Sequence, residues 1–237
     1  DKMRRVQTIR ESKDLVTWTP QEVFLRPDEQ DSPITEFYLM KAFPYAQGYA
    51  GLLMKYCADP AKPKEHSGIV ATELVVSHDA RTWQRPFRDT DLVFWAYTAP
   101  FVREGKLHFV VGKTGAIEQL TYRPRRLTGV AAHGATDGVF VTQPFAMPAT
   151  DLAIDADTSS GWIEVEALDT EKTSTEGFGP ARVEKVDGEV IPLVWEGLRS
   201  LDLPLAECRL RFKLHNATLY AITTMSESNA EETPSES

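Results

Sequence analysis

Residues 77–83 read SHDARTW and repeat the earlier SKDLVTW of residues 12–18, so that both follow the pattern Ser-x-Asp-x-x-Thr-Trp. Each copy follows a run of β-forming residues and precedes a charged segment that contains proline. This pattern predicts a strand, a tight turn and a short return strand, because Ser and Asp side chains can bond backbone N–H groups two residues on. The Trp would then re-enter the sheet and pack across the turn. The alternative is two unrelated β-turns.

The residues before the second copy form apolar runs of strand length. They cover residues 37–45, 49–57 and 68–77, and turn-forming residues separate them. With the return strand at Trp83 they predict a four-stranded antiparallel sheet, which is the size of one β-propeller blade. Residues 92–122 predict three further strands, with Glu104-Gly105 as a hairpin signal. No third copy of the heptad closes this second set.

The second half of the chain has shorter strands in which apolar and polar residues alternate. Alternation is clearest in residues 162–168 and 209–214, and it predicts strands with one buried and one solvated face. A two-sheet antiparallel sandwich is the simplest arrangement of such strands. We therefore predict an all-β chain with blades at 1–126, a β-sandwich at 127–224 and a disordered acidic tail at 225–237.

Composition supports this division and excludes several classes of protein. The chain has 237 residues, of which 42% are hydrophobic, and a net charge of −9. Acidic residues far outnumber basic ones after residue 138, whereas the two nearly balance before it, so nucleic acid is not expected as a partner. No apolar run is long enough for a membrane-spanning helix, so no membrane association is expected. The basic stretch 123–126 is interpreted as a solvated linker.

Neither a metal site nor a cofactor is expected. The five histidines are scattered without ligand spacing, and no phosphate-binding loop or dinucleotide fingerprint occurs. Cys57 and Cys208 fall in different predicted domains, and we interpret them as unpaired buried thiols. The first five residues contain no apolar segment of the kind found in secretory signals.

The two heptads, with several other stretches in the same order, give the chain a resemblance to a known family. It resembles five-bladed β-propeller carbohydrate-active enzymes, in particular proteins similar to the N-terminal domain of glycoside hydrolase family 32. The other stretches are residues 35–40, 43–45, 49–53, 138–145, 209–212 and 219–221. The resemblance spans nearly the whole chain to about residue 224. It implies about two blades of a partial propeller followed by a small β-sandwich.

The resemblance also implies a function. The chain would be a fragment of an extracellular or periplasmic glycoside hydrolase-like protein that cleaves glycosidic bonds of an oligo- or polysaccharide. Its partners would be a carbohydrate ligand and either the missing N-terminal blades or a second copy of the chain. Most catalytic acids of the family lie on the first three blades, so this chain alone should not hydrolyse glycosides.

Glu36 is the best-placed candidate for a catalytic carboxylate. Propeller glycosidases use carboxylates that line a central funnel, one of them as a general acid. An acid beside aromatic rings would have a raised pKa, and the neighbouring Phe37, Tyr38 and the later Tyr45 would offer stacking faces to sugars. The alternative is that Glu36 is a solvated residue at the start of a strand.

Asp89, Asp91 and Trp95 form a second candidate group for substrate binding. Two acids at positions i and i+2 of a strand face the same side, so they could bind a pair of sugar hydroxyls or a cation. The alternative is a polar loop before a strand. Family members often carry Arg and paired Asn after an Asp in this segment, and this sequence lacks them.

Three functions therefore stay open at the level of sequence. The first is glycoside hydrolysis in the full-length protein, and the second is carbohydrate binding or a structural role without catalysis. The aromatic residues fit both, because stacking serves binding and positioning alike; they are Phe37, Tyr38, Tyr45, Trp95 and Tyr97. The third is an all-β protein with no sugar ligand, since a fold by itself does not determine function.

Overall fold

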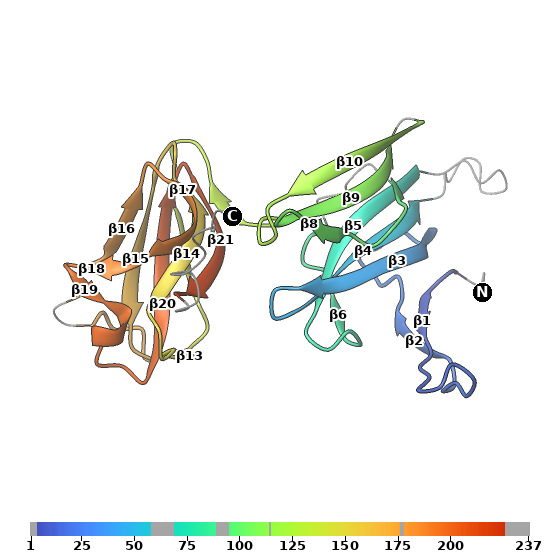
Figure 1. Ribbon diagram of the computed structural model, residues 1–237, viewed down its shortest axis with the longest axis horizontal. Helices are drawn as coiled ribbons and strands as arrows, with labels where there is room; N and C mark the ends of the chain where they lie inside the picture. Colours follow the sequence, from blue (N-terminus) through green and yellow to red (C-terminus); the bar gives the residue numbers. More distant parts are fainter. Residues whose placement is uncertain (1–3, 58–68, 89–94, 114, 176–177, 226–237) are drawn as a thin grey trace, which may run out of the picture. The chain divides into compact units, whose positions relative to one another are not determined.

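The structure is a computed structural model that describes residues 4–57, 69–88, 95–113, 115–175 and 178–225 (Figure 1). It consists of antiparallel strands, and the only helix among the described residues is the short 3-10 turn η1 (Ser200–Asp202). This confirms the predicted all-β class. The chain divides into two compact units, Asp1–Pro124 and Arg125–Ser237, here called unit 1 and unit 2. No helix in the described residues is long and apolar enough to cross a membrane.

The central sheet of unit 1 is the four-stranded meander predicted around the second heptad. Its strands pair in chain order, each antiparallel to the next. This order follows from short connections, which favour hairpin neighbours. The strands are β3 (Thr35–Tyr45), β4 (Gly48–Cys57), β5 (Ile69–Ser77) and β6 (Trp83–Gln84).

A second four-stranded sheet and a hairpin complete unit 1. In the second sheet β9 is central and pairs with the other three strands. The turn before β9 has positive φ at both Glu104 and Gly105, as the hairpin prediction requires. The number of blades, and a five-bladed propeller, remain predictions. The strands are β7 (Trp95–Ala96), β8 (Phe101–Arg103), β9 (Lys106–Lys113) and β10 (Ala116–Tyr122), and the hairpin is β1 (Gln7–Ile9) with β2 (Glu22–Leu25).

The two heptads fold into the same turn. In each copy the Asp Oδ1 accepts backbone N–H groups from two and three residues on, at 2.8 and 2.7 Å, for Asp14 and for Asp79 alike. The Ser hydroxyl lies 3.0 Å from the same oxygen in both. The next residue takes positive φ, 61° at Leu15 and 60° at Ala80. The predicted side-chain-to-backbone bonds are thus confirmed, and the two copies share one turn. The predicted return strand is present at Trp83, which begins β6, but Trp18 lies in no strand, so that part of the prediction is wrong for the first copy.

Unit 2 is a two-layer antiparallel structure whose core lies between its two main sheets. Ile154 and Leu219 from one sheet pack with Ile163 and Phe212 from the other. Ile163 and Phe212 are inward side chains of the alternation predicted for residues 162–168 and 209–214. One sheet has the order β11 (Val130–Ala132), β21 (Ala217–Thr224), β14 (Leu152–Asp157), β17 (Asp187–Pro192). The other has β12 (Gly138–Val141), β20 (Glu207–His215), β15 (Trp162–Leu168), β16 (Ala181–Glu184), with β13 (Phe145–Ala146) also on β20. A small hairpin joins β18 (Val194–Trp195) to β19 (Leu198–Arg199).

Candidate functional site

A β-bulge in β3 decides which side chains share a face of the central sheet. Phe37 pairs with Lys55 and Leu39 with Met54, so Tyr38 is the extra, unpaired residue of the bulge. Directly opposed residues point to the same side of an antiparallel sheet. One face, the core face, therefore carries Phe37 and Lys55, and the other carries Glu36 with its partner Tyr56.

The other face, which is itself largely buried through Leu52 and Met54, brings together three of the predicted site residues. The ring of Tyr38 lies 5.6 Å from that of Tyr56 and 6.1 Å from that of Trp95, edge to face in the second case. Arg5 lies over the Tyr38 ring at 4.3 Å and pairs with Glu36, Nη1 to Oε2, at 3.3 Å. We call Arg5, Glu36, Tyr38, Tyr56 and Trp95 the Tyr38 cluster. Tyr38 remains 37% exposed.

Arg5 reaches this cluster because its backbone is fastened to β3. The Arg5 carbonyl accepts the N–H of Phe37 at 3.0 Å, and the side-chain amide of Gln7 donates to the Phe37 carbonyl at 3.0 Å. The cluster thus assembles residues from the segment before β1 and from the strands β3, β4 and β7. An arginine at this position was not predicted, since nothing in the sequence near residue 5 links it to residue 36.

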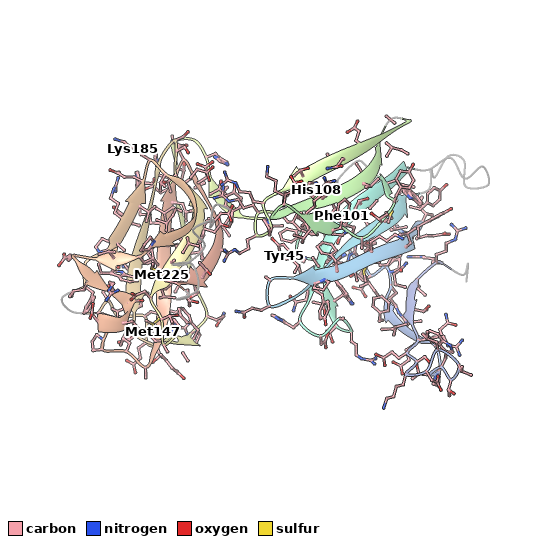
Figure 2. The ribbon with its side chains drawn as sticks, in the orientation of Figure 1. Tyr45, Phe101, His108, Met147, Lys185 and Met225 are labelled. Atoms are coloured by element: carbon pink, nitrogen blue, oxygen red, sulfur yellow. The ribbon has the colours of Figure 1, made fainter. Side chains whose placement is uncertain are left out.

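The other predicted residues lie elsewhere. Phe37 is fully buried in the core face with Leu53, Val75 and Trp83, so its ring offers no surface to a ligand. Tyr45 lies at the opposite end of β3 from Glu36 (Figure 2). The nine positions that separate them correspond to about 30 Å at the usual strand rise. The ring of Tyr45 packs on that of Phe43. Asp89 and Asp91 fall outside the described residues.

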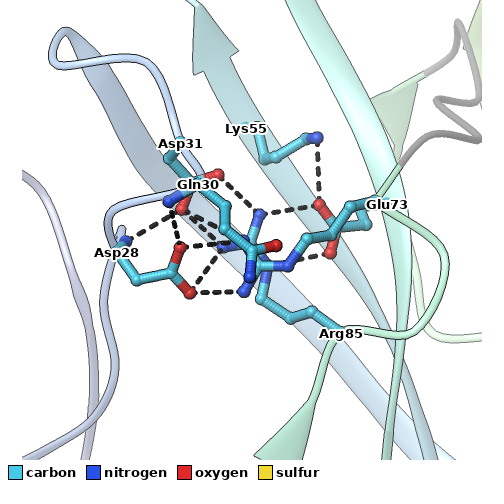
Figure 3. A network of polar contacts seen from close by, with 7 residues as sticks. Asp28, Gln30, Asp31, Lys55, Glu73 and Arg85 are labelled. Atoms are coloured by element: carbon cyan, nitrogen blue, oxygen red, sulfur yellow. Dashed lines mark hydrogen bonds and ion pairs between the residues drawn. The ribbon is translucent and has the colours of Figure 1, made fainter.

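On the core face, a buried network of charges surrounds Arg85 (Figure 3). Its guanidinium binds Glu73 through Nε and Nη2, both at 2.8 Å, and Asp31 through Nη1 and Nη2, at 2.5 and 2.8 Å. The side chains of Arg85, Glu73 and Asp31 are 3%, 0% and 7% exposed. Lys55 adds a second cation at 2.9 Å from Glu73. The paired forks satisfy charges that would otherwise be costly to bury.

These contacts keep the carboxylates of the network ionised. Burial opposes the charge on Glu73, but hydrogen bonds from Arg85 and Lys55 outweigh it and lower the pKa of Glu73 below its usual value. The same balance, with Arg85 as donor, lowers the pKa of Asp31. At the edge of the network, hydrogen bonding to Arg88 lowers the pKa of Asp28.

The network forms the wall of a pocket of about 580 Å³. Asp31, Lys55, Arg85 and Arg88 line it with uncharged polar side chains. Sequence reasoning missed this pocket, because its members lie far apart in the chain and only the isolated charges Lys55 and Glu73, inside otherwise apolar strands, hint at it. Within the described residues no group of three or more His, Cys, Asp or Glu side chains is placed to hold a metal ion.

Comparison with known protein families, with curated proteins and with solved structures finds no match to this chain.

Proposed function

We propose that the chain binds carbohydrate through the Tyr38 cluster. The observation that carries the proposal is the convergence of a partly exposed aromatic ring, Tyr38, with a second ring, Trp95, and an ion pair, Arg5–Glu36. The C–H groups of a sugar ring pack favourably against an aromatic side chain. Its hydroxyl groups both donate and accept hydrogen bonds, and a carboxylate beside a guanidinium meets both needs.

Binding without cleavage fits the described carboxylates better than hydrolysis does. A glycosidase needs one carboxylic acid that stays protonated until it reaches the leaving oxygen. The network around Arg85 lowers the pKa of both Asp31 and Glu73, so neither of these carboxylates suits that role. Hydrolysis by a longer protein, completed by further blades or by a second copy and located outside the cytoplasm, remains a prediction from the resemblance.

The proposal is tested by screening an oligosaccharide array and then titrating the best ligand calorimetrically. Tyr38→Ala should weaken binding at least about tenfold, a loss of about 1.4 kcal/mol, because it removes the stacking surface. The matched control is Tyr49→Ala, since Tyr49 is also 37% exposed and lies at the far end of β4. Equal binding by Tyr38→Ala and wild type, or binding of no saccharide in the array, would contradict the proposal. Release of reducing ends on incubation would instead favour hydrolysis.

A further inference from the structure

The pocket beside Arg85 is separate from the Tyr38 cluster, because the two use opposite faces of the central sheet. Its charged lining is unbalanced. Three cations, Lys55, Arg85 and Arg88, share the wall with a single carboxylate, Asp31. Such a wall suits a negatively charged group if the carboxylates that neutralise these three cations lie outside the pocket or are already hydrogen-bonded to protein groups.

Of the three carboxylates of the network, only Asp31 lines the pocket. Glu73 is fully buried behind Arg85 and does not line the pocket. Both oxygens of Asp31 accept hydrogen bonds from Arg85, and one also accepts the backbone N–H of Asp28 at 2.9 Å. The six charged residues of the network, counting Asp28, sum to zero. An anion would therefore be attracted by the placement of the charges rather than by a net charge.

Arg88 is the cation that is able to turn toward a ligand. Its side chain is 23% exposed; it is hydrogen-bonded to Asp28, whose side chain is 44% exposed, and lies 3.6 Å from Asp31. The exposed pair with Asp28 contributes at most about 1 kcal/mol. When Arg88 leaves, water can solvate Asp28, and Asp31 keeps both hydrogen bonds from Arg85. Arg85, in contrast, is 3% exposed and held by two carboxylate forks, so it supplies a fixed positive charge.

The uncharged lining adds further hydrogen-bond donors. Ser32 and Thr35 bring hydroxyl groups and Gln30 brings a side-chain amide. A volume of about 580 Å³ is within the range of small-ligand sites. We propose that this pocket binds an oxyanion group, a carboxylate, sulfate or phosphate, of a small ligand, with Arg88 swinging from Asp28 to contact it.

Calorimetric titration at constant ionic strength tests this, with sodium sulfate, inorganic phosphate, sodium acetate and the neutral acetamide as probes. The oxyanions should bind and acetamide should not, and the order among the three oxyanions identifies the preferred group. Arg88→Gln should weaken oxyanion binding at least about tenfold, whereas Arg88→Lys should retain part of it. Arg182→Gln is the matched control, because Arg182 also pairs with two carboxylates but lies in unit 2.

Three results would overturn the inference. Acetamide could bind as tightly as acetate, Arg88→Gln could bind oxyanions like the wild type, or none of the probes could bind at millimolar concentration. Thermal melting of Arg88→Gln verifies that the variant is folded. Tyr38→Ala should leave oxyanion binding unchanged, so the inference stands or falls independently of carbohydrate binding at the Tyr38 cluster.

Discussion

At the scale of single residues, the two heptads separate what a turn determines locally from what the surrounding sheet adds. Both Trp indoles donate to the carbonyl three residues back, at 3.3 Å for Trp18 and 3.0 Å for Trp83. Trp83 is nevertheless 9% exposed, against 46% for Trp18. The difference arises because Trp83 joins a core with Phe37, Leu53 and Val75. Local sequence fixes the turn, and long-range packing decides the burial.

This contrast predicts unequal costs for the same substitution. Trp83→Ala should lower the free energy of unfolding of unit 1 by about 3 to 5 kcal/mol, because it empties a core position. Trp18→Ala should cost about 1 kcal/mol or less, since most of the lost contact is with solvent. Urea denaturation of both variants measures the difference. Similar costs would mean that the first heptad is also packed against other structure.

A second pair of substitutions tests the charge network. Arg85→Met should destabilise unit 1 by about 3 to 5 kcal/mol, because Glu73 and Asp31 would be left buried with too little positive charge. Arg88→Met should cost no more than about 1 kcal/mol, since Asp28 remains partly solvated and Asp31, 3.6 Å from Arg88, keeps both hydrogen bonds from Arg85. Chemical denaturation followed by circular dichroism compares them. If Arg85→Met proved as mild as Arg88→Met, the network would not stabilise the fold.

At the scale of elements, the strands of the central sheet were predictable and their faces were not. Apolar runs and turn residues located β3, β4 and β5 closely. Strict alternation would, however, place Glu36 and Tyr45 on opposite faces, because nine positions separate them. The bulge at Tyr38 shifts the alternation, so both lie on the same face, opposite to the face that carries Phe37. No local signal in residues 35–45 distinguishes a bulge from regular pairing.

The candidate sites, too, could be predicted from the sequence only in part. Aromatic residues near a carboxylate predicted a sugar-binding set, and the structure brings Glu36, Tyr38 and Trp95 together. Phe37 could not be separated from Tyr38 by sequence, since only the sheet register shows that one faces the core. The Arg85 network joins positions up to 60 residues apart. Contacts of that range follow from the fold and cannot be read from residue spacing.

At the scale of the whole molecule, each unit contains its own buried ion pair. The interpretation of residues 123–126 as a solvated linker is wrong for Arg126. Its side chain is 10% exposed and donates to Asp155 at 2.7 Å, and its guanidinium also lies 4.5 Å from the centre of the Tyr220 ring. Burial raises the pKa of Asp155 despite the opposing effect of Arg126, and its Oδ2 has no hydrogen-bond partner. The sequence signal missed was Asp155 itself, a charge within an apolar strand.

The buried carboxylates of the two units have pKa shifts of opposite sign, so acid should affect these two buried sites differently; the more exposed Asp137 and Asp157 of unit 2 have lowered pKa values. In unit 1 the native pKa values of Asp31 and Glu73 lie below the ordinary 3.8 and 4.5. The stability these groups contribute is complete above the ordinary values and is lost as the pH falls through the lower, native ones. In unit 2 the native pKa of Asp155 is raised, so protonation on acidification relieves a penalty.

Scanning calorimetry between about pH 7 and pH 3 should therefore show the transition of unit 1 falling further than that of unit 2. The transition that Trp83→Ala lowers identifies unit 1, because Trp83 lies in its core. Glu73→Gln should make this transition less sensitive to acid, at the cost of lower stability at neutral pH, since the buried cations lose a charged partner. If both transitions fell equally, or unit 2 unfolded first in acid, the buried carboxylates around Arg85 would not control the acid stability of unit 1.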